Sequence, residues 1–85
     1  MLKRMSSSQC RGARALIDMT QPQLAAAAII GLSTVVDFER ERRAVSDEAI
    51  GKMRRALETA GVEFIDENGG GAGVRLRERK KDFGK

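Results

Sequence analysis

Apolar residues recur at helical spacing along the first two thirds of the chain. Between about Ser8 and Met19 they fall three to four positions apart, a pattern that predicts an amphipathic helix. Pro22 stands in the first turn behind a Thr20 N-cap, and the alanine run that follows has high helix propensity. A break near residues 29–31 separates this short second helix from a third, which we expect to end near residue 40.

The fourth predicted helix shows the clearest pattern. Ser46 is a suitable N-cap, the acidic residues behind it favour the positive end of the helix dipole, and Gly61 is typical of a helix end. The apolar stripe of this helix consists of Ile50, Met53, Leu57 and Ala60. With three Phe and no Trp or Tyr in the chain, the core must be mainly aliphatic, which suits packed helices.

The pattern changes after Gly61 from helical to alternating. Residues 62–65 are β-prone, residues 67–73 are rich in glycine, and residues 74–77 alternate apolar with basic side chains. These features predict a β-hairpin or a pair of strands.

The expected fold class is therefore mainly α, with four helices followed by a small C-terminal β-hairpin or strand pair. Eighty-five residues suffice for one small domain. The predicted parts are a disordered N-terminus (1–7), a helical domain (8–61), a strand pair (62–77) and a charged flexible tail (78–85).

The absence of histidine removes several kinds of chemistry. It excludes His-dependent triads, His general bases and His metal sites. A single cysteine also excludes an intrachain disulfide and a multi-cysteine zinc site. That residue, Cys10, lies on the apolar face of the first predicted helix and is expected in the core. Because the carboxylates are scattered over helix surfaces, we expect neither an enzyme nor a bound metal or cofactor.

The charge balance permits nucleic acid as a partner without requiring it. Sixteen basic and twelve acidic residues leave a net charge of +4 at pH 7, which is a modest excess. The longest weakly polar run, residues 24–36, is shorter than the about 20 apolar residues that a membrane span needs. The N-terminus lacks the apolar region of a signal peptide, so we expect a cytoplasmic protein.

Two short helices joined by a tight turn inside a helical bundle are the arrangement of a helix-turn-helix module. The motif here reads Thr20-Gln21-x-x-Leu24-Ala25, then Val35, then Asp37-Phe38-Glu39-Arg40. It resembles the XRE family, the phage repressor-like and Cro-like DNA-binding domains, over about residues 10–57. The C-terminal runs Gly61-Val62-Glu63-Phe64-Ile65, Asn68-Gly69-Gly70-Gly71 and Gly73-Val74-Arg75-Leu76-Arg77 are similar to those of short bacterial members.

The resemblance implies a sequence-specific DNA-binding transcriptional regulator, a repressor of bacterial or mobile-element origin. It also implies a homodimer that binds a palindromic operator through a recognition helix at about residues 31–40. The side chains expected at base edges are Leu32, Ser33, Thr34, Val36 and Asp37. Hydroxyl groups bond to several bases, aliphatic groups pack on thymine methyls, and a carboxylate accepts from a cytosine amino group.

Phosphate contacts are expected at both ends of the motif. The resemblance places Gln21 against a phosphate, where the helix N-terminus also attracts anions. The arginines that follow the recognition helix, and that suit backbone phosphates, are Arg40, Arg42 and Arg43. Glu39 and Glu41 lie between them and weaken the local positive field.

One ion pair with a structural role is implied by the same resemblance. It sets Arg14 of the first helix against Glu39 of the third, largely out of contact with water. Such a pair adds little net stability, but removing one partner strands a buried charge at a cost of about 3–5 kcal/mol.

The turn before the recognition helix departs from the family. The family has Gly where this chain has Ile29, and a small polar cap where this chain has Gly31. A β-branched residue is poor at positive φ. Either Ile29 avoids that conformation, or the turn moves to residues 31–33 and Ser33 becomes the cap. The chain length between the two helices favours the first alignment.

The dimer contact is expected in the C-terminal strands. The edges of a strand pair can bind a second chain, and a lone hairpin is only marginally stable. The residues expected there are Val62, Phe64, Ile65, Val74 and Leu76. Pairing of the strands within the chain and pairing across the dimer both stay open.

An alternative function is a protein-interaction regulator, antitoxin-like or an antiactivator. In this role the same fold occludes a partner protein through its Leu- and Ala-rich surface and its strand edges. The low net charge, and Leu32 and Asp37 in the recognition helix, favour this alternative.

Overall fold

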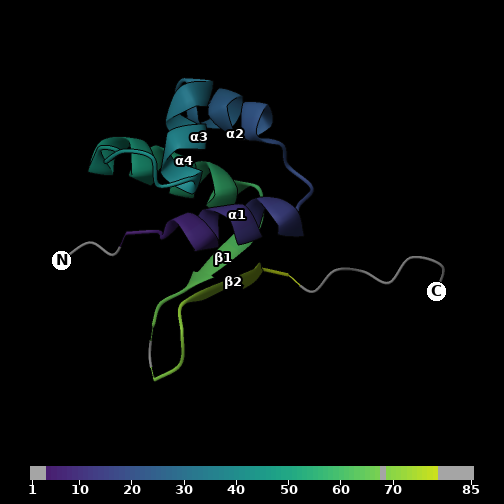
Figure 1. Cartoon of the computed structure of the whole chain (residues 1–85). Helices are drawn as coiled ribbons and strands as arrows, with labels where there is room; N and C mark the ends of the chain where they lie inside the picture. Colours follow the sequence, from purple (N-terminus) through teal and green to yellow (C-terminus); the bar gives the residue numbers. More distant parts are fainter. Residues whose placement is uncertain (1–3, 68, 79–85) are drawn as a thin grey trace.

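A hairpin follows four helices in the computed structural model, which describes residues 4–67 and 69–78 (Figure 1). The elements are α1 (Ser7–Leu16), α2 (Gln21–Ala28), α3 (Leu32–Glu39), α4 (Asp47–Thr59), β1 (Val62–Ile65) and β2 (Gly73–Leu76). The strands pair antiparallel, with Val62 opposite Leu76 and Phe64 opposite Val74. The predicted fold class is confirmed, and the strands pair within one chain.

Polar side chains start three of the helices. The hydroxyls of Ser6 and Thr20 accept from the backbone N–H groups of Gln9 and Gln23 at 3.0 and 3.1 Å. In return, each glutamine side-chain oxygen accepts from the backbone N–H of the cap residue. Ser46 caps α4 in the predicted way. These caps satisfy N–H groups that a helix end leaves without partners, which is why the helices begin where they do.

The folded domain begins before residue 8. The sequence predicts a disordered end over residues 1–7, whereas Ser6 caps α1 and the Met5 side chain is only 2% exposed in the core. For residues 4–7 the prediction is wrong, because the apolar partners of Met5 come from parts of the chain that a local sequence window does not contain. Residues 1–3 and 79–85, which are predicted to be disordered or flexible, lie outside the described residues.

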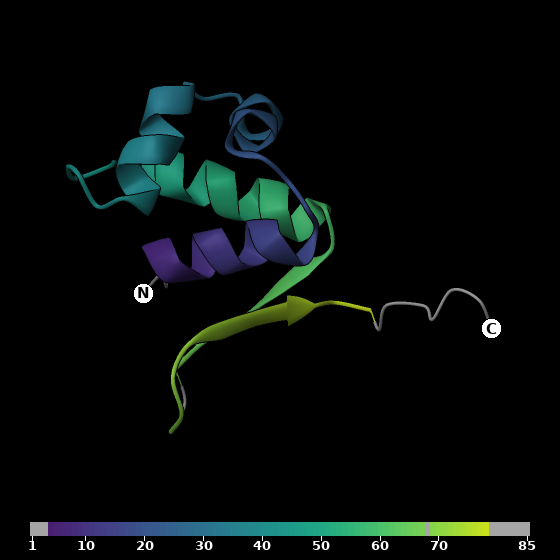
Figure 2. The same cartoon turned by 45° about the vertical axis from the view of Figure 1, so that its right-hand side comes forward.

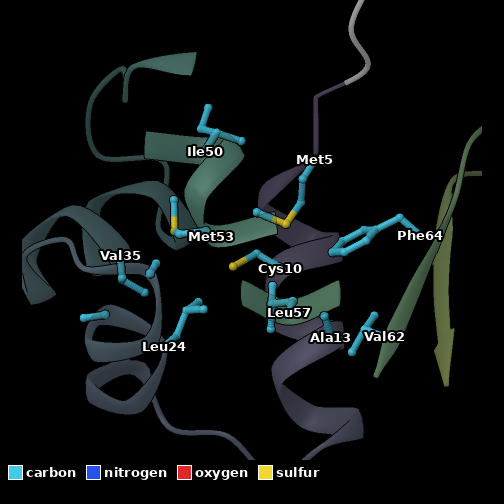
Figure 3. Packing of buried hydrophobic residues seen from close by; sticks show 12 residues of the cluster. Met5, Cys10, Ala13, Leu24, Val35, Ile50, Met53, Leu57, Val62 and Phe64 are labelled. Atoms are coloured by element: carbon cyan, nitrogen blue, oxygen red, sulfur yellow. The ribbon is translucent and has the colours of Figure 1, made fainter. Parts of the chain in front are cut away.

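The core is aliphatic and sulfur-containing, with one aromatic ring at its edge (Figure 3). Its fully buried members are Cys10, Ala13, Leu24, Val35, Met53, Leu57 and Val62. Phe64 reaches this cluster from β1, and the Arg54 guanidinium lies 4.7 Å from the centre of its ring. The predicted place of Cys10 in the core is confirmed.

The helix-turn-helix pair and the hairpin lie on opposite sides of the molecule (Figures 1 and 2). Helices α2 and α3 pack on α4 and α1 from above, whereas β1 contacts α4 and β2 contacts α1 from below. Strand β2 packs closely on α1 at Gly12, where a Cβ would lie 3.4 Å from Val74 Cγ2. Within residues 4–67 and 69–78, no helix has the length and hydrophobicity needed to cross a membrane.

One buried amide joins the start of α1 to the hairpin. The Gln9 side-chain oxygen accepts from the Ser6 backbone N–H at 2.9 Å. Its nitrogen donates to the carbonyls of Gly73 at 3.0 Å and Ile65 at 3.4 Å. Because Ile65 and Gly73 face each other where the strands enter the connecting loop, one side chain holds both strands at that end.

Candidate nucleic-acid interface

The turn between α2 and α3 has the first of the two alignments that the sequence allows. Ile29 ends α2 in the left-handed conformation, with φ 58° and ψ 53°, and α3 begins at Leu32. The expectation that a β-branched residue avoids this conformation is wrong. The N–H groups of Ile29 and Ile30 donate to α2 carbonyls at 3.2 and 3.0 Å, which closes the helix at the cost of a strained backbone.

The first turn of α3 presents two of the five predicted base-contact residues to solvent. Leu32 is 45% exposed and Ser33 is exposed, whereas Thr34 and Val36 are half-buried. Gly31 precedes them and offers no side-chain cap. The surface at the start of α3 is therefore small, uncharged and open, with one hydroxyl available to a partner.

The fifth predicted base-contact residue, Asp37, is engaged within the chain. Its carboxylate lies 2.7 Å from Arg43 Nε and 3.9 Å from Arg42 Nη1, and its side chain is 19% exposed. The structure thus joins a residue predicted to read bases with two residues predicted to bind phosphates.

The loop after α3 folds back to make this contact possible. Glu41 has a φ of 55°, and the Arg42 backbone N–H donates to the Asp37 carbonyl at 2.9 Å. The Glu41 carboxylate also accepts from the Ser7 hydroxyl at 2.7 Å, which ties the loop to α1. Arg40, at the end of α3, stays exposed.

The predicted ion pair between Arg14 and Glu39 is present and bidentate. Arg14 Nε and Nη2 each lie 2.7 Å from a Glu39 carboxylate oxygen, and Nη1 donates to the Met19 carbonyl at 2.9 Å. The Glu39 side chain is 1% exposed. This pair fixes α3 against α1, which is the structural role that the resemblance implies.

Three further groups donate hydrogen bonds to Glu39, and the sequence does not predict them. The Gln21 amide donates to Glu39 Oε1 at 3.0 Å, and the Cys10 thiol donates to Oε2 at 3.1 Å. Arg11 donates to the Glu39 backbone carbonyl. The predicted phosphate contact of Gln21 therefore competes with an intrachain bond, and this amide links the start of α2 to the end of α3.

Burial and hydrogen bonding together set the charge states in this cluster. Burial alone raises the pKa of Glu39, but the bonds from Arg14, Cys10 and Gln21 outweigh it, so the pKa lies below the usual value for glutamate. The bond to Glu39 also raises the pKa of Arg14. Burial, and then the bond to the same carboxylate, raises the pKa of the Cys10 thiol, which stays protonated at neutral pH.

The predicted dimer residues divide between the core and the surface. Val62 and Phe64 are buried against the helices of their own chain, and Val74 packs beside them. Ile65 is exposed and Leu76 is half-buried. A dimer contact through Val62 and Phe64 would require this core to open, because alternate residues of a strand face opposite sides.

A shallow groove lies beside the strained turn, between the end of α2 and the outer face of α4. It is lined by Ala27, Ala28, Ile29, Lys52, Arg55, Ala56 and Thr59. Ile29 is 84% exposed there. Of the residues that the structure describes, no three Cys, Asp or Glu side chains are grouped to hold a metal ion.

Comparisons with known proteins add no family to this description. No model of a protein family matches the chain, and no curated protein matches it. Function is therefore inferred from the geometry of α2, α3 and the loop that follows them.

Proposed function

We propose that this protein is a sequence-specific DNA-binding transcriptional regulator of the cytoplasm that acts as a repressor. One observation carries the proposal: the exposed first turn of α3 projects from the face opposite the hairpin, on a helix held at a fixed angle (Figure 2). The buried Glu39 network, which joins α1, α2 and α3, supplies that rigidity. A rigid helix whose first residues reach base edges is the working part of a helix-turn-helix reader.

The arginines beyond α3 supply the phosphate contacts in this proposal. Arg40 is exposed, and the side chains of Arg42 and Arg43 are 60% and 56% exposed. A guanidinium group binds phosphate in a bidentate manner, so these residues suit the backbone beside the major groove. Leu32 and Ser33 then carry the direct contacts to bases.

A palindromic operator requires two copies of the reader. We propose a homodimer that uses the outer strand edges together with the exposed Ile65. Val62 and Phe64 are excluded from this contact because they fill the core of their own chain.

The test is a fluorescence-anisotropy titration against DNA from upstream of the protein's own gene, beside a scrambled duplex, at two salt concentrations. Ser33→Ala should weaken binding to the cognate duplex alone. Arg40→Ala should weaken binding to both duplexes and lower the salt slope by about one. Arg54→Gln, whose side chain lies over Phe64 on the hairpin side of α4, is the control and should change neither. Equal binding of both duplexes by every variant would refute sequence-specific reading.

A second candidate function is protein binding by the same face. The observation that favours it is the apolar character of the turn: Ile29 is exposed, Leu32 is partly exposed, and α3 contains no basic residue. In that case Ile29→Ser should abolish activity in the cell, whereas Arg40→Ala should leave it intact. The opposite pattern supports DNA binding.

A further inference from the structure

Asp37 and the arginines behind α3 form a contact that the backbone itself arranges. The left-handed Glu41 turns the chain back along α3, and the Arg42 N–H bonds to the Asp37 carbonyl. This brings Arg43 Nε to 2.7 Å from the carboxylate. The backbone of the loop therefore positions this ion pair, which does not depend on a random encounter of flexible side chains.

The two partners have conflicting preferences at a DNA surface. Arg43 gains from a phosphate, whereas the carboxylate is repelled by phosphates and by the acceptor atoms of guanine and thymine. Cytosine is the base that offers a major-groove donor without a neighbouring acceptor, through its amino group. A carboxylate that bonds to cytosine no longer needs Arg43, and the guanidinium is then free to move to a phosphate.

We propose that Asp37 is a specificity-determining residue. Its carboxylate keeps Arg43 away from phosphate until a cytosine amino group takes the place of the Arg43 guanidinium. The role of Asp37 rests on the proposed DNA-binding function and couples base recognition to phosphate binding. Arg43 binds a phosphate only when Asp37 has bonded to the cytosine of a G·C pair. At other DNA sequences Arg43 stays paired with Asp37. The pair thus lowers non-specific binding more than cognate binding.

The first experiment measures affinity for a random-sequence duplex as a function of salt. Asp37→Asn preserves the shape of the side chain and releases Arg43. It should bind the random duplex about fivefold more tightly than the original chain does, a gain that corresponds to the stabilisation by a surface ion pair. The salt slope should steepen by about one.

Glu58→Gln is the matched control for the added charge. It also raises the net charge by one, and it removes the carboxylate that pairs with Arg54 at 3.1 Å. Glu58 lies in the last turn of α4, from which the chain leads into β1, so this variant should bind like the original chain. An equal gain in both variants would mean that net charge alone is responsible and would overturn the proposal.

The double variant Asp37→Asn/Arg43→Gln isolates the role of the arginine. It should return the salt slope to that of the original chain, because the released phosphate contact is gone. A slope that stays as steep as in Asp37→Asn would show that Arg43 is not the withheld group, which contradicts the proposal. A thermal melt of each variant verifies folding before binding is measured.

The second experiment selects bound sequences from a library of random duplexes. The original chain should enrich cytosine at one position in each half-site, and Asp37→Asn should lose that preference while keeping the rest of the motif. Identical motifs from both proteins would overturn the inference and leave the proposed function intact. Failure of both proteins to select any motif would instead refute the proposed function.

Discussion

Glu39 concentrates more polar contacts than any other described side chain in this molecule, and its removal should be costly. Glu39→Gln keeps the shape but leaves the Arg14 charge half-buried without its carboxylate, a loss of about 3–5 kcal/mol in the free energy of unfolding. Urea denaturation at pH 7 measures this loss. A loss below about 1 kcal/mol would mean that water reaches Arg14 readily.

The same residue makes stability depend on acid. The pKa of Glu39 is lower in the folded chain than in the unfolded one, so its contribution is complete above the unfolded value, near 4.5. That contribution is lost as the pH falls through the lower folded value. The original chain should therefore lose stability steeply below about pH 4.5, and Glu39→Gln should flatten this part of the profile. A profile that stays equally steep would assign the acid sensitivity to other carboxylates.

Ile29 offers a route to a more stable protein. A left-handed backbone costs an L-residue about 1–2 kcal/mol, and glycine avoids that cost while losing about 0.5–1 kcal/mol through greater freedom when unfolded. Because the Ile29 side chain is 84% exposed, Ile29→Gly should raise stability by about 1 kcal/mol. Ile30→Gly is the control, and it should lower stability because Ile30 packs against the core. Destabilisation by both variants would show that Ile29 makes a contact that the fold needs.

At the scale of elements, the helices were predictable because their signals are local. Ser46, Thr20 and the apolar stripes act within a few residues of their own positions. The contact between Asp37 and Arg43 was not predictable, because it depends on a left-handed residue that is not glycine. The pair of Arg14 and Glu39 followed only from the resemblance, since no local pattern links positions 25 residues apart.

The hairpin shows why the faces of short strands are hard to assign from sequence. The sequence of a short strand does not state which alternate set of its residues meets the helices. Val62 and Phe64 face inward in the structure, whereas Ile65 is exposed. The predicted dimer residues mixed these two sets.

Neighbouring positions in β1 should therefore respond differently to the same substitution. Phe64→Ser should cost about 3–5 kcal/mol of stability at any protein concentration, because it opens the core. Ile65→Ser should leave the monomer within about 1 kcal/mol of the original chain and weaken only self-association. Chemical denaturation and sedimentation equilibrium separate the two effects. A concentration-dependent defect in Phe64→Ser would instead place that ring in a contact between chains.

At the scale of the whole molecule, the reactivity of the Cys10 thiol measures whether the core is folded. Its thiol is fully buried, donates to Glu39 and is held in the protonated form. Reaction with a thiol-specific reagent should therefore require global unfolding, and its rate should follow the free energy of unfolding as urea is added. Rapid labelling of the native protein would reveal local opening of α1.

The Gln9 amide has a consequence for when this chain can fold during synthesis. Its acceptors Ile65 and Gly73 lie 56 and 64 residues further along, so they leave the ribosome long after α1. Until they arrive, the amide nitrogen has only water as a partner, and Val62 and Phe64 are missing from the core. Complete packing of the helices therefore requires residues 62–73 to have left the ribosome.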